Sequence, residues 1–290
     1  MVGAGAMGSV LGELAEKGEF KNRVVYWDAV PDKVPGQAPL SVCVPQAAVV
    51  FLCVPSSAVR PAAEAIAPCL DKKTVVLTIA KGLEKNTGKT MPRVLIEALP
   101  KGQPSGLLSG PMLASELKSG KGGMAVVALP NLSAFRPVNK VFQASNLRLV
   151  YSKNVEAVAW AGVLKNIYAV ALGIADGIGW GFNRKGWLVT QAIHEMAVVA
   201  EALHVSVDEV LGVAGLADLV ATGFSTTSRN REAGRKLAAD ERLGSEGVRS
   251  LVLLFKRLPS RAKDDVPILC GLARIVGRKS SAAAVFSRLF

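Results

Sequence analysis

Two lysines in this chain of 290 residues have surroundings that suit chemistry. Lys81 follows an apolar run from Thr74 to Ala80, which predicts an ammonium at the carboxyl end of a parallel strand, where doubly wound sheets bind ligands. Lys165 lies within a long apolar stretch, where desolvation lowers the pKa of an amine toward values useful for proton transfer. A solvated loop lysine is a competing interpretation for Lys81. A purely structural interpretation is weaker for Lys165, because burying a lysine without a role is costly.

A glycine pattern, G-x-G-x-x-G from Gly3 to Gly8, opens the chain and leads into a helix-like stretch, Ser9 to Lys17. Such glycines permit a tight turn, the approach of backbone amides to a pyrophosphate, and close helix–strand packing. Asp28 ends the strand-like run from Val24 and can accept ribose hydroxyls while repelling a 2′-phosphate. An ordinary glycine-rich turn is the alternative, because only Met1 and Val2 remain of a preceding strand. A sheet lacking that strand would bind a cofactor weakly.

A further polar group lies in the last third of the chain. Asp218 stands within Gly215 to Leu219, and Ser228-Arg229-Asn230 stands at the head of the next helix-like stretch. Arginine, asparagine and free backbone amides at a helix start can hold a phosphate. The alternative is helix capping by Ser228 with arginines on the surface.

Composition excludes several classes of protein. Half of the residues are apolar and 20% are charged, which excludes a disordered chain. The four cysteines show no C-x-x-C pairing and no histidine at ligand spacing, so no disulfide framework or metal site is predicted. The net charge of +12 admits nucleic acid, anionic lipid or phosphorylated metabolites as partners. Residues 229–290 hold fourteen basic and six acidic residues but few aromatics, which favours a solvated helical surface over a nucleic-acid site.

The apolar stretch from Ala157 to Ala175 is long enough to cross a bilayer. Lys165 and Asn166 lie in its middle, and a central lysine costs about 2.5–3.5 kcal/mol on membrane-insertion scales. We therefore expect the central helix of a soluble domain. No secretory signal is visible, so the expected location is the cytoplasm.

The spacing of apolar runs predicts the elements that position these residues. Short runs alternate with helical stretches up to residue 151, and only helical periodicity follows. The expected fold is therefore α/β: a Rossmann-type, doubly wound, mostly parallel sheet in residues 1–151 and an all-helical second domain in residues 152–290. Expected strands are residues 24–27, 49–54, 74–79, 106–108, 124–129 and 147–151; expected helices in the second half are residues 155–175, 187–204, 228–239 and 247–258.

A series of short motifs follows in a fixed order along the chain: the turn at Gly3, Val54-Pro55-Ser56, Ala80-Lys81-Gly82, Ser109-Gly110-Pro111, Leu164-Lys165-Asn166, Gly177 to Gly179 with Asn183, Gly215 to Leu219, Ser228 to Asn230 with Gly234, and Glu246-Gly247. Taken together in this order, the motifs resemble those of the NAD(P)-dependent glycerol-3-phosphate dehydrogenase family. The chain departs from the family pattern in its short first strand, at Met112, where a serine is usual, and at Ala217, where a glycine is usual.

The resemblance implies reversible hydride transfer between a nicotinamide cofactor and the C2 carbonyl of dihydroxyacetone phosphate, with Lys165, Lys81 and Asp218 as catalytic residues. NAD is the expected cofactor, because Asp28 favours it, and NADP is not excluded; a homodimer is expected by analogy. The implied substrate contacts are Lys81, Gly110, Lys165, Asn166, Asp218, Ser228, Arg229 and Asn230. The implied cofactor contacts are Gly3, Ala4, Gly5, Ala6, Met7, Gly8, Asp28, Lys81, Ala114, Arg229 and Glu246.

Two other functions stay open at this point. One is a ketopantoate-reductase-like enzyme that acts on a keto acid without a phosphate. The other is a non-catalytic protein that binds a cofactor or nucleic acid. A substrate panel separates the first from the expected enzyme, because removing the charge of Arg229 should affect only a phosphorylated ligand.

Overall fold

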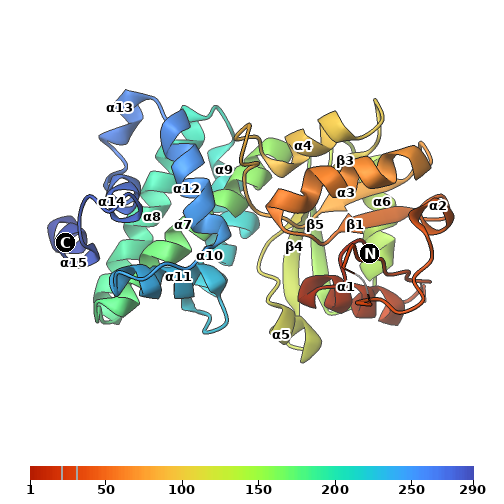
Figure 1. Cartoon of the computed structure of the whole chain (residues 1–290), viewed down its shortest axis with the longest axis horizontal. Coiled ribbons are helices and arrows are strands. Elements are labelled where there is room, and N and C mark those ends of the chain that lie inside the picture. Colours follow the sequence, from red (N-terminus) through yellow and green to blue (C-terminus); the bar gives the residue numbers. More distant parts are fainter. Residues whose placement is uncertain (21, 31) are drawn as a thin grey trace. The chain divides into compact units, whose positions relative to one another are not determined.

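The computed structural model describes residues 1–20, 22–30 and 32–290, which form two compact units. The first unit contains Met1–Ala80 and Lys89–Ala159, and the second contains Lys81–Gly88 and Trp160–Phe290 (Figure 1). The sequence placed the boundary at residues 151 and 152. The partition differs because the start of the long apolar helix belongs to the first unit, and because Lys81 binds residues of the helical unit.

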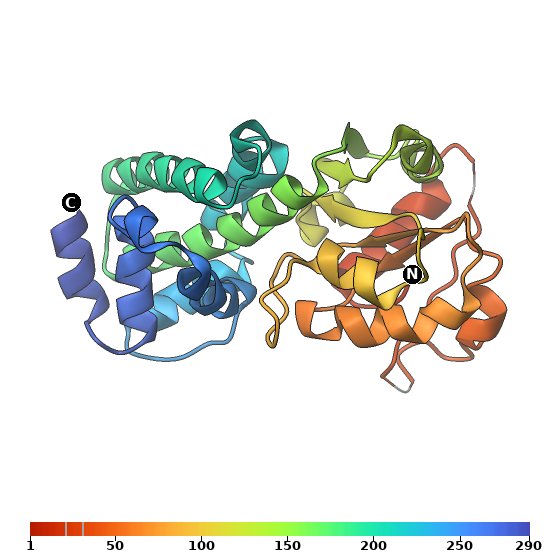
Figure 2. The ribbon, with the colours of Figure 1, turned by 90° about the horizontal axis from the view of Figure 1, so that it is seen from above.

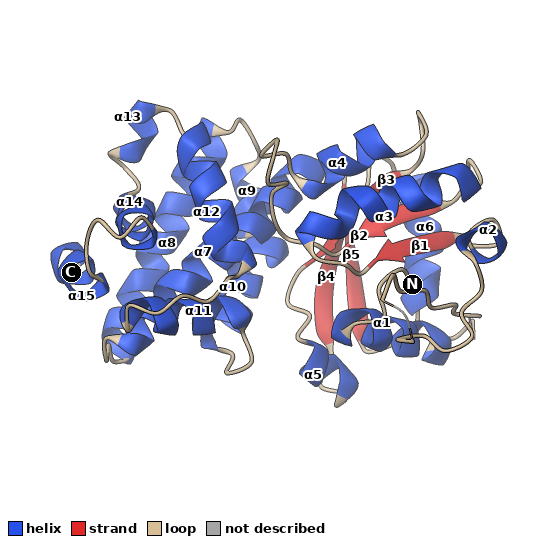
Figure 3. Cartoon of the chain, in the orientation of Figure 1, coloured by secondary structure: helices blue, strands red, loops and turns tan. Residues whose placement is uncertain are grey.

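The first unit alternates strands with helices (Figure 3). Its strands are β1 (Val49–Leu52), β2 (Val75–Thr78), β3 (Ser105–Ser109), β4 (Gly123–Ala128) and β5 (Leu147–Ser152). Its helices are α1 (Ala6–Lys17), α2 (Leu40–Cys43), α3 (Val59–Ile66), α4 (Met91–Ala98), α5 (Ala114–Lys118) and α6 (Leu132–Phe142), with 3₁₀ turns at Ser56–Ala58 and Ala67–Cys69.

Among the described residues the strands form one sheet in the order β1-β2-β3-β4-β5. The pairs β1·β2, β2·β3 and β4·β5 are parallel, and β3·β4 is antiparallel. A parallel pair needs a crossover connection, which α3, α4 and α6 supply. The mostly parallel sheet predicted from the sequence is confirmed.

The short first strand that the sequence indicates is reduced in the structure to isolated bridges at Val2, beside the five-stranded sheet. Val2 bridges both Trp27 and Leu52 in parallel. Its amide donates to the carbonyl of Phe51 at 2.8 Å, and its carbonyl accepts from the amide of Cys53 at 2.7 Å. On the other side the amide of Gly3 donates to Trp27 at 2.7 Å. The predicted strand 24–27 is likewise reduced to the single bridge at Trp27.

This pairing fixes where a ligand can bind in the first unit. From Val2 the chain passes through α1 to Trp27 on one side, and then returns to β1 on the other side. The connections therefore diverge at the end of Val2, directly before Gly3. Open α/β sheets bind ligands at such a switch point, outside the carboxyl ends of the strands.

Side-chain alternation along the strands divides the core of the first unit into two layers. Val50 and Val76 point to the layer filled by α3 and α4, whereas Phe51 and Leu77 point to the layer filled by α1 and α6. Helices thus cover both faces of the sheet, which confirms the predicted doubly wound fold. Burial on both faces also explains why the strands are continuous apolar runs.

The second unit is helical and has the long helix α7 at its centre (Figure 2). Its predicted helices are confirmed, except that α8 begins at Phe182, five residues before the predicted start. Its helices are α7 (Val155–Gly177, shared with the first unit up to Ala159), α8 (Phe182–Ala202), α9 (Val207–Leu211), α10 (Asp218–Phe224), α11 (Arg229–Ala238), α12 (Glu246–Arg257), α13 (Ser260–Lys263), α14 (Pro267–Val276) and α15 (Ala282–Leu289).

α7 is long and apolar enough to span a membrane by composition, but its apolar window is 100% buried in the structure. Lys165 and Asn166, in its middle, are 6% and 4% exposed. This burial is that of a core helix, as the sequence predicts, and it places an amine in the interior of the helical unit.

A second buried polar group joins three helices of this unit. Glu195 of α8 accepts a hydrogen bond from the Tyr168 hydroxyl of α7 at 3.0 Å. It also accepts from the amides of Ile268 and Leu269, in the first turn of α14. The carboxyl therefore satisfies helix-terminal donors that have no partner within their own helix. Burial raises the pKa of Glu195 to about 7, although these hydrogen bonds oppose the shift.

This shift predicts a pH-dependent stability. The folded state holds the Glu195 proton more tightly than the unfolded chain does, because the pKa of this carboxyl is about 4.5 in the unfolded chain. The free energy of unfolding should therefore fall by about 3 kcal/mol as the pH rises from about 4.5 to about 7, and this term should be absent in Glu195→Gln. Urea unfolding at a series of pH values measures it. Glu201→Gln, on the exposed face of the same helix, is the control; a wild-type pH slope in Glu195→Gln contradicts the prediction.

Candidate active site

Lys165 is the buried amine of the helical unit. Its ammonium donates to Asp218 Oδ1 at 3.1 Å and to Thr222 Oγ1 at 2.8 Å. The Thr222 hydroxyl in turn donates to the same Asp218 oxygen at 3.0 Å. Asp218 and Thr222 are four residues apart on α10, so they share one face of that helix. The amine is thus held by an anion and a hydroxyl.

Asp218 also holds the second lysine that the sequence singled out. Lys81 Nζ lies 2.6 Å from Asp218 Oδ2, so the two carboxylate oxygens face two ammonium groups. Asp218 is 2% exposed and begins α10 directly after a π-helical turn, Val213–Ala217. Such turns are frequent at functional sites. The structure therefore brings together all three residues predicted to be catalytic.

Burial and charge set the proton affinities in this cluster. Burial lowers the pKa of Lys165 to about 8; Asp218 opposes the shift and the nearby Lys81 charge adds to it. Burial would raise the pKa of Asp218, but the charges of Lys165 and Lys81 outweigh it and hold that pKa below its usual value. Asp218 is therefore an anion near neutral pH, while Lys165 can gain and lose a proton.

A chain of amides connects this cluster to the predicted substrate residues. The Asn166 amide nitrogen donates to the carbonyl of Lys81 at 2.8 Å, and Asn230 donates to Asn166 Oδ1 at 2.8 Å. The amide of Gly247 donates to Asn230 Oδ1 at 2.9 Å. These bonds hold the start of α11 and α12 against the segment that carries Lys81. Each asparagine keeps a second N–H for another acceptor.

Ser228 and Arg229 stand at the head of α11. The Ser228 hydroxyl accepts from the amide of Arg231 at 3.2 Å, so it caps the helix, as in the alternative interpretation. Arg231 and Lys185 both pair with Asp176. Arg229 is exposed and forms no ion pair with any residue that the structure describes. A cation and helix amides therefore stand beside Asn230, in an arrangement suited to an anion.

The glycine turn lies in the first unit. Gly3 has φ +99°, and a Cβ there would lie 2.6 Å from the carbonyl oxygen of Cys53. A Cβ on Gly8 would lie 2.0 Å from the carbonyl oxygen of Gly3, whereas nothing lies within 4 Å of one on Gly5. The turn packs tightly on the protein side and is open at Gly5. With Ala4, Ala6 and Met7 around it, and α1 beginning at Ala6, it fits a dinucleotide pyrophosphate.

Asp28 is fixed against this turn. Its Oδ2 accepts from the amide of Ala4 at 2.8 Å, and its Oδ1 accepts from the amide of Val30 at 3.0 Å. Burial would raise the pKa of Asp28, but these bonds and Lys33 hold it below its usual value. Asp28 therefore lies beside the glycine turn, and its predicted contact with the ribose hydroxyls stays a prediction.

The other predicted substrate and cofactor contacts, Gly110, Ala114 and Glu246, lie at the ends of strands or helices. Gly110, after β3, has φ +152°, and a Cβ there would lie 2.6 Å from the carbonyl oxygen of Met124. Ala114 begins α5, and Glu246 begins α12, where it pairs with Arg249 at 3.2 Å. Met112, where the family has serine, is packed in the core of the first unit.

Sequence reasoning missed Thr222. The signal available was its spacing, four residues after Asp218, which puts both side chains on one face of a helix. It also missed that Asn166 and Asn230 bind each other, because no pattern in the sequence pairs residues 64 positions apart.

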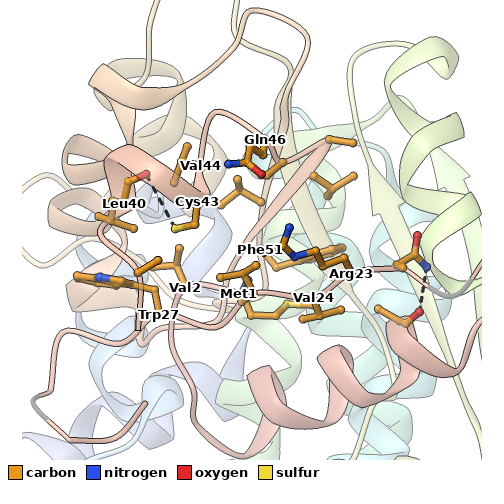
Figure 4. Close-up of a pocket in the computed structure, with 18 of the residues that line it drawn as sticks. Met1, Val2, Arg23, Val24, Trp27, Leu40, Cys43, Val44, Gln46 and Phe51 are labelled. Carbon is orange, nitrogen blue, oxygen red and sulfur yellow. Dashed lines mark hydrogen bonds between the residues drawn. The ribbon is translucent and has the colours of Figure 1, made fainter. Parts of the chain in front are cut away.

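An apolar cavity of about 350 Å³ lies elsewhere in the first unit (Figure 4). Met1, Val2, Val24, Leu40 and Phe51 are among its lining residues. None of the predicted site residues is among the described residues that line it. It lies beside the start of the short first strand and not at the glycine turn that follows.

Comparison with known proteins identifies relatives that match most of the chain. Residues 21–135 match the family model for the N-terminus of NAD-dependent glycerol-3-phosphate dehydrogenase, and residues 154–287 match the model for its C-terminus. The glycerol-3-phosphate dehydrogenase [NAD(P)+] of Chlorobium limicola is 35% identical over 259 residues, which cover 82% of this chain and 78% of the relative. That of a Thermoanaerobacter species is 36% identical over 228 residues, which cover 76% and 68%.

Solved structures share the fold. The glycerol-3-phosphate dehydrogenase of Coxiella burnetii has a TM-score of 0.84 at 23% identity, over 99% of this chain and 97% of that one. A ketopantoate reductase from Ralstonia eutropha has a TM-score of 0.59 at 18% identity, over 96% of this chain and 99% of that one.

Proposed function

Because this chain belongs to the NAD-dependent glycerol-3-phosphate dehydrogenase family, we propose that Lys165 is the residue that moves the proton in its reaction. The activity is NAD(P)-dependent reduction of the C2 carbonyl of dihydroxyacetone phosphate to sn-glycerol 3-phosphate, and its reverse. The observation that carries the proposal is the buried ammonium of Lys165, held by Asp218 and Thr222 beside Lys81.

The reaction needs one hydride and one proton. A nicotinamide cofactor held at the turn Gly3–Gly8 would supply the hydride for C2 in reduction and would take it up in oxidation. Lys165 donates its proton to the carbonyl oxygen as the negative charge develops, and it removes the hydroxyl proton in the reverse direction. A pKa near 8 suits both directions, because the amine exchanges its proton readily close to neutral pH.

Asp218 and Lys81 act beside Lys165. Asp218 fixes the position of both ammonium groups through its two oxygens. Lys81 binds the substrate and polarises its carbonyl, because its charge favours the oxyanion over the neutral ketone. Proton transfer of the kind proposed for Lys165 typically accelerates a reaction about 10²–10⁴-fold. Positioning and electrostatics supply the remaining rate acceleration.

The head of α11 is the proposed phosphate site. Arg229 supplies the charge, the α11 backbone beside Ser228 supplies amides, and the spare N–H groups of Asn166 and Asn230 supply further donors. Gly110 serves the substrate through its main chain. The remaining proposed cofactor contacts are the turn Gly3–Gly8 with Asp28 in the first unit, and Lys81, Ala114, Arg229 and Glu246.

Replacing Arg229 tests whether the substrate is phosphorylated. In Arg229→Gln we expect the KM for dihydroxyacetone phosphate to rise about 10- to 100-fold, since hydrogen bonds to charged groups contribute about 1.5–3 kcal/mol. At saturating NADH, where a weakened cofactor contact of Arg229 no longer limits the rate, turnover of a keto acid without a phosphate should not change. The consumption of NADH absorbance measures both, and Arg235→Gln, an exposed arginine on the same helix, is the control. Equal losses with both substrates, or faster reduction of the keto acid by the unaltered enzyme, would favour the ketopantoate-reductase-like function.

We also propose a substrate class, a cellular location and an oligomeric state for the enzyme. Its partner is a small phosphorylated metabolite, which the net charge of +12 attracts. It acts in the cytoplasm, as a homodimer, and without nucleic acid. The limited number of aromatic residues in the basic C-terminal region supports the last point.

A further inference from the structure

Lys33 forms an ion pair with the carboxylate that faces the glycine turn. Its ammonium lies 3.0 Å from Asp28 Oδ2, the oxygen that also accepts from the amide of Ala4. The Lys33 side chain is 41% exposed and that of Asp28 is 9% exposed. A solvent-accessible cation therefore lies over a nearly buried anion beside the turn.

Hydrogen bonds fasten the segment that carries Lys33 to Asp28. The amide of Asp28 donates to Gln37 Oε1 at 2.8 Å, and Gln37 Nε2 donates back to the carbonyl of Asp28 at 3.0 Å. The amide of Val30 donates to Asp28 Oδ1, and the amide of Lys33 donates to the carbonyl of Val30. The backbone on both sides of Lys33 is thus tied to the residue that Lys33 pairs with.

The position of this pair matters for the adenosine ribose. An acidic residue at the end of the second strand accepts the ribose hydroxyls of NAD, whereas a 2′-phosphate in the same place brings about two negative charges. Asp28 alone would repel that phosphate. An ammonium 3.0 Å from its oxygen offsets the carboxylate charge and can turn to an anion placed beside it.

We infer that Lys33 binds the 2′-phosphate of NADP and so lets this chain accept a cofactor that Asp28 alone would exclude. The inference rests on the proposed function only in requiring a nicotinamide dinucleotide at the glycine turn. With NAD, Asp28 binds the ribose and Lys33 stays paired with Asp28. With NADP, the Lys33 ammonium exchanges the carboxylate for the phosphate.

Binding of the two cofactors tests this without turnover. NAD⁺ and NADP⁺ are titrated by calorimetry into the unaltered protein, Lys33→Ala, Lys33→Arg and Lys72→Ala, which removes an exposed lysine elsewhere in the first unit. In Lys33→Ala we expect the Kd for NADP⁺ to rise about tenfold or more at low salt and that for NAD⁺ to change less than about twofold. The loss should shrink at about 1 M salt, because the phosphate contact is exposed to solvent. Lys33→Arg should retain NADP⁺ binding, and Lys72→Ala should match the unaltered protein.

Two results would overturn the inference alone: an unchanged Kd for NADP⁺ in Lys33→Ala, or equal weakening of both cofactors. If the unaltered protein binds neither cofactor, the cofactor assignment fails, and the inference fails with it. The Lys165 and Arg229 variants test proton transfer and substrate binding by activity, whereas the Lys33 variants test cofactor binding by calorimetry. A failure of the inference about Lys33 is therefore distinguishable from a failure of the proposed function.

Discussion

Lys165→Met should reduce turnover with dihydroxyacetone phosphate about 10²–10⁴-fold, while the protein remains folded and still binds its cofactor. Methionine keeps the apolar length of the side chain on α7 but cannot donate a proton. Asp218 keeps Lys81 as its partner in this variant, so no buried carboxylate is left without a cation. The rate of NADH consumption at saturating substrate measures the loss.

Lys185→Met is the matched control for this prediction. Lys185 is also buried, at 8% exposure, and it pairs with Asp176 at 2.9 Å, outside the proposed catalytic cluster. Its loss should affect stability without a comparable effect on turnover. A Lys165→Met enzyme with an unchanged rate would remove the proposed proton-transfer role.

The pH profile gives a second readout of Lys165. Reduction needs the protonated amine, so its rate should fall as the pH rises through about 8. Oxidation of glycerol 3-phosphate needs the neutral amine, so its rate should rise over the same range. Thr222→Val removes an acceptor of the ammonium, which disfavours the charged form and should move both inflections to lower pH.

Asp218→Asn should destabilise the folded protein by about 3–5 kcal/mol, because removing one partner of a buried ion pair leaves an uncompensated charge. Here two ammonium groups, those of Lys81 and Lys165, lose their shared anion. The pKa of Lys165 should then fall below about 8, since the attraction that opposed burial is gone. Urea unfolding measures the first effect, and the pH–rate profile measures the second.

Asp176→Asn separates the two effects of Asp218→Asn. Asp176 also pairs with two cations, Lys185 and Arg231, so its loss should reduce stability too. The pH inflection assigned to Lys165 should not move in that variant. An Asp218→Asn enzyme with the stability and the pH profile of the unaltered protein would show that this carboxylate orients neither lysine.

Most of the strands and helices that local patterns predicted are present in the structure, because burial imposes its period on neighbouring residues. The apolar runs became β1, β2, β3, β4 and β5, and the apolar stretch with Lys165 became the core helix α7. The glycine spacing predicted the turn before α1, since tight packing at Gly3 and Gly8 excludes a side chain there.

The predictions failed where pairing replaces pattern. Residues 24–27 have the composition of a strand, but only Trp27 bridges to Val2, because a strand needs a partner of matching length. Helix α14 was not predicted, and its first turn is capped from α8, by Glu195, and not by a neighbouring residue. Lys81–Gly88 was assigned to the sheet domain, although Lys81 binds Asp218.

The sequence by itself determined which residues have the chemistry and which local elements carry them: a lysine on an apolar helix, another after a strand, a carboxylate and a glycine turn. Only the tertiary structure decided that Lys165 and Lys81 share the carboxylate of Asp218. It also decided that the Lys165 ammonium donates to the Thr222 hydroxyl. Hydrophobic periodicity repeats within a few residues, so it is readable along the chain. The distance between the Lys81 ammonium and the Asp218 carboxylate, 137 positions away, depends on how whole helices pack, and so does the burial that lowers the pKa of Lys165 to about 8.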